Sequence, residues 1–178
     1  MEIALLGLRL AVGLAFAAHG AQKLFGAFGG GGIAATARSF KRIGLRPGKL
    51  QAWIAGPIEF LGGFLIALGL VTPLAATALI AVMVAATLTA TLPNGFLVDN
   101  NGYEYNLVLV ATLVALAGIG AGDWSLDSAV GIDLTGTLPA LGALGVGVLG
   151  GLGAVLNGRL APGRDSGHGR RYAERQVA

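Results

Sequence analysis

Long apolar stretches separated by short polar segments dominate this chain. A helix needs about 20 mostly apolar residues to cross a bilayer. Five stretches come close to this length: residues 3–21, 53–70, 74–91, 103–119 and 136–156. The pattern therefore predicts an all-α polytopic membrane helical bundle.

The connections between these stretches differ in character. Only residues 70–73 separate the second stretch from the third, and so short a turn makes the two helices antiparallel neighbours. The first connection is long and carries basic residues without an acid: Lys23, Arg38, Lys41, Arg42, Arg46 and Lys49.

Inside the first connection, the pattern from Ile33 to Ile43 predicts a short amphipathic helix on the membrane surface. Its basic positions are expected to face the headgroups and its apolar positions the lipid. The apolar positions are Ile33, Ala37, Phe40 and Ile43. A solvated basic loop is the alternative.

Basic residues predict the orientation of the chain, because they gather in cytoplasmic connections. The first connection and the tail after Leu156 are both expected inside, since the tail carries Arg159, Arg164, Arg170, Arg171 and Arg175. Both can be inside only if an even number of spans separates them. We therefore predict five spans in a bacterial plasma membrane, with the N-terminus outside and the C-terminus in the cytoplasm.

The composition supports a membrane protein and limits its chemistry. Hydrophobic residues make up 54% of the 178 residues and charged residues 12%, against about 25% charged in soluble domains. Membrane lipids are therefore expected partners, and nucleic acid is not. The absence of cysteine from the sequence excludes disulfides, Fe–S clusters and Cys-based zinc sites within this chain. A redox role would need a bound cofactor or a partner protein.

Ionisable residues in the apolar stretches are the candidate functional residues, because charge in hydrocarbon persists mainly where it has a partner or a role. The predicted topology brings five polar side chains to one level near the cytoplasmic end: His19, Gln22, Glu59, Glu104 and Asn106. Two carboxylates with a histidine and amides suit proton transfer, and they could also bind the carbonyls of a quinone head. No paired histidine spacing supports a metal site, so none is expected.

These residues also have structural interpretations. Glu59 and His19 could hydrogen-bond to one another and join two helices, while Lys23 could reach out to the interface. Glu104 could satisfy N–H groups in the first turn of its helix. For Glu59 and His19 the structural and functional roles remain equally open.

Arg9 lies nearer the outer side of the first predicted span. It is expected to form an ion pair with Asp123 or Asp127 of the connection over residues 120–135, which the topology predicts outside, or to reach outward to the interface. These three residues are therefore candidates for a structural pair, separate from the polar cluster.

The last predicted span is glycine-rich and carries Ala143, Gly147 and Gly151 at four-residue spacing. Small residues at this spacing permit close helix approach. The contact could lie inside the bundle, or it could join the chain to a second copy or a larger membrane complex. The basic tail behind it is expected to be disordered or lipid-associated.

A series of motifs runs through the first 130 residues: Leu8-Arg9, then His19 to Gly26, Glu59 to Gly63, Leu68 to Ala76, Leu92 to Phe96, Gly102 to Tyr105 and Ser125 to Asp127. In order and spacing these motifs resemble the DoxX family of small membrane proteins. The family is a four-helix membrane bundle, which implies a core over residues 1–130, an additional transmembrane helix over 131–156 and a basic cytoplasmic tail over 157–178. Many relatives carry a histidine where this chain has Thr91.

The resemblance implies a role in membrane redox chemistry, because the family is named for a membrane subunit linked to thiosulfate oxidation with quinone as acceptor. Our leading hypothesis is an integral-membrane accessory subunit of a quinone-linked or respiratory complex, which anchors or stabilises an oxidoreductase and is itself non-catalytic. One alternative is a quinone-interacting oxidoreductase that uses His19, Glu59 and Glu104 to handle protons. Another is a small-solute or proton transporter. The sequence names neither the substrate nor the partner.

Overall fold

A computed structural model describes residues 1–161, and this part of the chain is built from helices without strands. In chain order the elements are α1 (Glu2–Phe25), η1 (Ala27–Gly29), α2 (Gly32–Arg42), α3 (Gly48–Leu68), α4 (Thr72–Ala86), η2 (Thr87–Thr91), η3 (Leu92–Asn94), η4 (Val98–Asn100), α5 (Glu104–Ile119), α6 (Leu126–Ala129) and α7 (Thr137–Leu160). The predicted all-α fold is confirmed.

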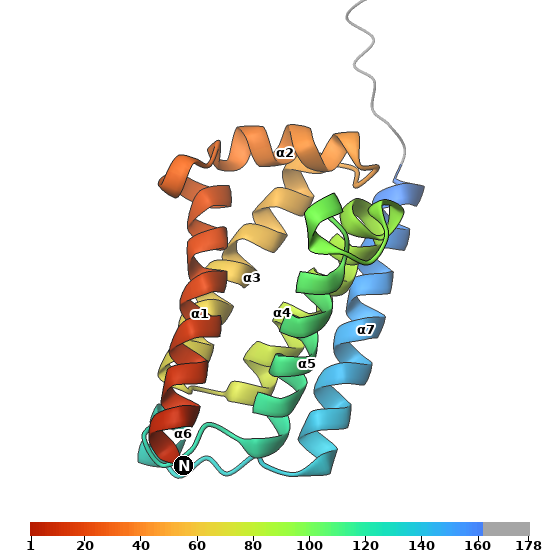
Figure 1. Ribbon diagram of the computed structural model, residues 1–178. Helices are drawn as coiled ribbons and strands as arrows, with labels where there is room; N and C mark the ends of the chain where they lie inside the picture. Colours follow the sequence, from red (N-terminus) through yellow and green to blue (C-terminus); the bar gives the residue numbers. More distant parts are fainter. Residues whose placement is uncertain (162–178) are drawn as a thin grey trace, which may run out of the picture.

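The helices α1, α3, α4, α5 and α7 run along one common direction, and α2 lies across one end of the bundle (Figure 1). Within residues 1–161, four stretches are long and apolar enough to cross a membrane: Glu2–Phe25, Gly48–Leu68, Thr72–Asn94 and Thr137–Leu160. The chain is therefore a multi-pass membrane protein. The remaining predicted span, α5, has 16 residues, so it is shorter than the others although it packs against α4 and α7.

Glycines bring α1 and α3 into close contact. A Cβ atom added to Gly13 would lie only 2.5 Å from the carbonyl oxygen of Gly63, and one added to Gly20 would lie 2.6 Å from the Cα of Phe60. Because glycine lacks a side chain, the two backbones can approach this closely. Glu59, which directly precedes Phe60, therefore lies against the last turns of α1.

The small residues of α7 make a contact inside the chain. Ala143 is buried, and a Cβ atom on Gly147 would lie 2.6 Å from Ile80 Cγ2 of α4. A Cβ atom on Gly151 would lie 2.7 Å from the Ala81 carbonyl oxygen. The packing interpretation of this motif is therefore confirmed. A contact between α7 and another protein would have to use the opposite face, which exposes leucines: Leu138, Leu141, Leu149 and Leu156.

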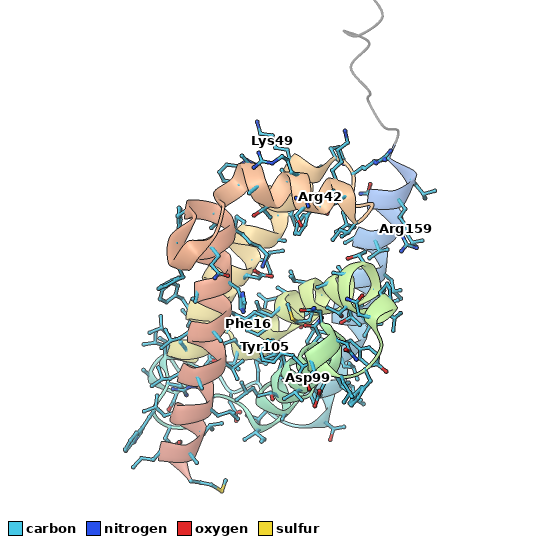
Figure 2. The ribbon with its side chains drawn as sticks, turned by 45° about the horizontal axis from the view of Figure 1, so that its top comes forward. Phe16, Arg42, Lys49, Asp99, Tyr105 and Arg159 are labelled. Atoms are coloured by element: carbon cyan, nitrogen blue, oxygen red, sulfur yellow. The ribbon has the colours of Figure 1, made fainter. Side chains whose placement is uncertain are left out.

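The basic first connection and the end of α7 lie at the same end of the bundle. The N–H of Arg46 donates to the carbonyl oxygen of Gly158 at 2.9 Å. Figure 2 shows Arg42, Lys49 and Arg159 at this end, whereas the N-terminus lies at the opposite end in Figure 1. This arrangement agrees with an even number of spans between the two basic segments. Which end faces the cytoplasm stays a prediction.

The predicted amphipathic helix is present as α2, but its apolar side does not face lipid as expected. Phe40 and Ile43 line a cavity inside the bundle. Ala37 packs against Gly48, where an added Cβ atom would lie 3.2 Å from the Ala37 carbonyl carbon. The apolar side turns inward because α2 covers the space between the helices, while Arg38, Lys41 and Arg42 stay exposed.

The end of α7 differs from the predicted boundary of the tail. The helix continues to Leu160, beyond residue 157 where the basic tail was expected to begin. The rest of the predicted tail, with its expected disorder or lipid association, lies outside the described residues. The division at residues 130 and 131 stays a prediction.

Candidate functional site

A cavity of about 440 Å³ lies in the bundle at the α2 end. Residues of α1 and α3 line one side of it, residues of α4, η2, α5 and α7 line the other, and α2 contributes its inner face. Ligand sites in proteins have volumes of roughly 300–1,000 Å³ and mostly apolar walls with a few polar groups. The polar lining residues here are His19, Lys23, Ser39, Gln51, Glu59, Thr89, Tyr105 and Asn106. The cavity is the candidate functional site.

An ion pair between Lys23 and Glu59 is the main charged feature of this cavity. The side chain of Glu59 is 3% exposed, while that of Lys23 is 25% exposed. A carboxylate so deeply buried within apolar surroundings needs a partner of opposite charge. Lys23 takes this role from the last turn of α1, because the glycines between α1 and α3 bring the two helices close enough. The expectation that Lys23 reaches out to the interface is therefore wrong.

His19 lines the same cavity without bonding to Glu59. In residues 1–161 the hydrogen bond of Glu59 goes to the Lys23 ammonium, so the predicted His19–Glu59 bond is replaced. His19 itself is exposed on the surface of α1. It therefore lies at the edge of the cavity, where the cavity meets the outside of the bundle.

Asn106 forms the wall of the cavity on α5 and joins it to the end of α4. Its Nδ2 atom donates to Thr87 Oγ1 at 3.1 Å and to Thr91 Oγ1 at 3.3 Å. Both threonines belong to η2, a π-helical segment, and such segments occur frequently at functional sites. Thr91 therefore contacts a residue of the cavity through its hydroxyl group.

Two members of the predicted cluster lie elsewhere. Gln22 donates through Nε2 to the carbonyl oxygen of Phe28 at 3.3 Å, in the loop after α1. Glu104 accepts from the N–H of Val98 at 3.0 Å, so it binds the preceding loop and caps no N–H of its own first turn. The structure brings His19, Glu59 and Asn106 to one cavity, and it leaves Gln22 and Glu104 outside that cavity.

Arg9 belongs to a separate polar site at the other end of the bundle. It is 1% exposed. Its Nη2 atom donates to the carbonyl oxygen of Trp124 at 2.6 Å, and Nη1 donates to that of Ala121. Among the described residues it forms no ion pair with Asp123 or Asp127, so the predicted pairing is wrong. Arg9 instead holds the loop before α6 through two carbonyl groups, which a planar guanidinium can bind together.

Asp127 is unavailable to Arg9 as a bonded partner because it binds the start of α4. Its carboxylate accepts from the N–H of Val71 at 2.6 Å and from that of Thr72 at 3.1 Å, and also from the Thr72 hydroxyl at 2.8 Å. A negative charge is favourable at the positive end of a helix. The other candidate partner, Asp123, donates its own N–H to the Glu2 carboxylate at 2.7 Å. These contacts join α1, α4 and the segment around α6.

Sequence reasoning missed the inward direction of Lys23 and the contributions of Phe40, Ile43 and Tyr105 to the cavity. One available signal pointed to Lys23, because a buried glutamate requires a nearby cation and Lys23 is the cation one turn from His19. The part played by α2 had no such signal, since an apolar helix face packs equally well against lipid or protein.

Comparison with known proteins agrees with the membrane bundle. The model of the DoxX family matches residues 4–92, which run from α1 to η3 and include Lys23 and Glu59. A Bacillus subtilis (strain 168) protein named "Putative oxidoreductase CatD" is 32% identical over 117 residues, covering 66% of this chain and 81% of the relative. An "uncharacterized membrane protein" of Mycobacterium tuberculosis (strain H37Rv) is 35% identical over 132 residues, covering 67% of this chain and 77% of the relative. No solved structure matches the chain. The family match and these relatives together show that the chain belongs to the DoxX family of membrane proteins.

Proposed function

We propose that this protein is the membrane-embedded accessory subunit of a redox complex and that it binds a quinone in the cavity beneath α2. One observation carries the proposal: a cavity of about 440 Å³ with largely apolar walls holds the Lys23–Glu59 ion pair. A quinone combines an apolar ring with carbonyl oxygens that accept hydrogen bonds. The walls suit the ring, and the ammonium group suits a carbonyl.

The residues of the cavity divide this work between them. An ammonium group has three N–H donors, and the structure assigns one donor of Lys23 to Glu59. The others are available to a carbonyl oxygen of the quinone. Glu59 keeps the ammonium group in place and offsets its charge inside the membrane. Bound quinone would supply the electron-accepting chemistry, and the protein would supply orientation and charge.

Two further observations support the redox assignment and the anchoring role. The Bacillus subtilis relative carries an oxidoreductase name. The end of the bundle that holds the cavity also exposes basic residues, Arg38, Lys41, Arg42, Lys49 and Arg159. Basic residues predict a cytoplasmic side, and a basic surface favours association with an acidic partner. We therefore place a soluble oxidoreductase on this face, in the cytoplasm of a bacterial cell.

Quinone binding is tested with the purified protein in lipid nanodiscs. We expect saturable binding of decylubiquinone that is lost in Ala55→Phe, because Ala55 lines the cavity and phenylalanine would fill it. The matched control on the same helix is Leu61→Phe, since Leu61 is 58% exposed and lies outside the cavity. Equal binding to both variants would contradict a quinone site in this cavity.

The subunit role is tested by isolating the tagged protein from native membranes under mild detergent. We expect a quinone-dependent oxidoreductase to copurify and its amount to fall when the exposed basic residues of α2 are changed together to glutamine. Recovery of the protein alone, with quinone-binding intact, would contradict the accessory role and leave the binding site standing.

The cavity also favours one alternative, in which the chain catalyses the reduction of quinone to quinol with two electrons from a separate soluble donor of the nicotinamide class. Glu59 and His19 are proton-exchanging groups at the cavity, and proton transfer to a reduced quinone needs such groups. Glu104 drops out of this set because it lies outside the cavity. Reduction of quinone by added NADH in the presence of the isolated protein, abolished in Glu59→Gln and retained in Leu61→Phe, would establish the alternative.

A further inference from the structure

The cavity reaches the surface of the bundle between α1 and α5. His19 of α1 and Tyr105 of α5 both line it, and both are exposed, with Tyr105 at 45%. Figure 2 labels Phe16 and Tyr105, which line the cavity from α1 and α5. The cavity therefore has an opening on this side, flanked by one histidine and one tyrosine.

On the α1 side, this opening lies within the apolar length of a helix that is long enough to cross a membrane. His19 is six residues before Phe25, the end of α1, which places it about 9 Å from the helix end at 1.5 Å per residue. The end of the bundle itself is covered by α2 and the turn behind it, whose inner residues include Phe40, Ile43 and Leu45. Leu45 is 5% exposed. A molecule dissolved in the bilayer can therefore reach the opening from the side of the bundle. A molecule in water approaches the end of the bundle and meets the apolar cover formed by α2.

Polar groups are distributed unevenly within the cavity. Lys23 and Gln51 lie near the α2 end, in the last turn of α1 and the first turn of α3, and Glu59 pairs with Lys23. One turn farther from α2 than His19 and Tyr105, the walls include Phe16 and Leu109, which are buried apolar residues. The ion pair therefore suits the polar head of a ligand, and these apolar walls suit its ring.

Building on the proposed quinone site, we infer that the ligand is a membrane-dissolved amphiphile whose apolar tail leaves the cavity between α1 and α5. The head, a ring that bears hydrogen-bond acceptors, lies against Lys23. The tail passes between His19 and Tyr105 and continues into the lipid. The cavity volume of about 440 Å³ suits the head with short substituents, and the opening lets a long tail remain outside the protein.

The tail position is tested by bridging the opening. The sequence has no cysteine, so a His19→Cys, Tyr105→Cys double variant can be joined by a bismaleimide without side reactions. Binding is measured in nanodiscs for decylubiquinone, which has a tail, and for duroquinone, which has none. We expect bridging to abolish decylubiquinone binding and to leave duroquinone binding as it is in the unbridged double variant.

A matched control bridges a second exposed edge of the cavity, which Ile54 of α3 and Gly150 of α7 line. This edge would be the alternative exit for the tail. The Ile54→Cys, Gly150→Cys variant, when bridged, should retain both ligands. Loss of decylubiquinone in this control, or equal effects on the two ligands in the first variant, would overturn the inference. If neither ligand binds the unmodified protein, the proposed quinone site fails instead.

A single substitution gives an independent test if the double variant does not fold. Tyr105→Ala removes one side of the opening without adding bulk. We expect faster association of decylubiquinone and unchanged association of duroquinone in stopped-flow measurements. Unchanged rates for both ligands would contradict a tail between α1 and α5.

Discussion

The two partners of the Lys23–Glu59 ion pair should differ in how much their loss destabilises the protein. Lys23→Met leaves Glu59 without a partner while its side chain is 3% exposed, and Glu59→Gln leaves Lys23, which is 25% exposed. Removing one partner of a buried pair typically costs about 3–5 kcal/mol, because the remaining charge stays desolvated. This value applies to Lys23→Met, since the Glu59 side chain is 3% exposed and lies in the interior of α3.

Glu59→Gln should lower the free energy of unfolding by less, because Lys23 lies in the last turn of α1. A lysine near a helix end can turn its ammonium group out to the interface, so only the partly exposed pair is lost, at about 1 kcal/mol. The double variant should be closer to the unmodified protein than Lys23→Met, since no unpaired charge remains.

The assay is reversible unfolding in mixed micelles, with the free energy of unfolding obtained by titration with sodium dodecyl sulfate and followed by circular dichroism. All three variants are compared with Leu61→Ile on the exposed side of α3 as the control. Equal losses for the two single variants would refute the reasoning, because they would show that the exposure of the residue left behind does not matter.

Three further predictions use the same assay. Asp127→Ala should lower the free energy of unfolding by about 1–3 kcal/mol, because the start of α4 loses a charged acceptor of two N–H groups; an effect within error would contradict the capping role. Gly147→Val should prevent α7 from packing on Ile80, whereas Gly153→Ala, which meets no atom within 4 Å, should be neutral or stabilise by up to about 1 kcal/mol. Arg9→Lys should cost about 1–3 kcal/mol, since an ammonium group cannot bind two carbonyls as a planar fork does; full stability of this variant would show that charge alone suffices.

Hydropathy and turn length predicted most of the bundle, because both act locally. The turn at residues 70–73 joins antiparallel neighbours as expected, and the amphipathic helix after the first span is present as α2. The surroundings of α2 could not be predicted in the same way. The apolar side of α2 is removed from water whether lipid or other side chains of the cavity cover it, so its sequence pattern is the same in both cases.

The sequence predicted only part of the candidate site, because it gives the depth of a residue but not the direction of its side chain. Topology and distance along each helix placed His19, Glu59 and Asn106 at one level, and these residues line one cavity. Depth alone does not give the direction of a side chain around the helix axis. Gln22 and Glu104 share the level but bind loops instead.

The sequence by itself determined that this chain is a helical membrane protein of the DoxX family, because apolar length, basic connections and ordered motifs are properties of the chain alone. Only the tertiary structure decided which charges meet. Arg9 lies among carbonyl groups while Asp127 caps a helix, and Lys23 turns inward to Glu59. Pairing in a membrane depends on which side chains face each other across close helix contacts, and here glycines such as Gly13 and Gly20 set those contacts.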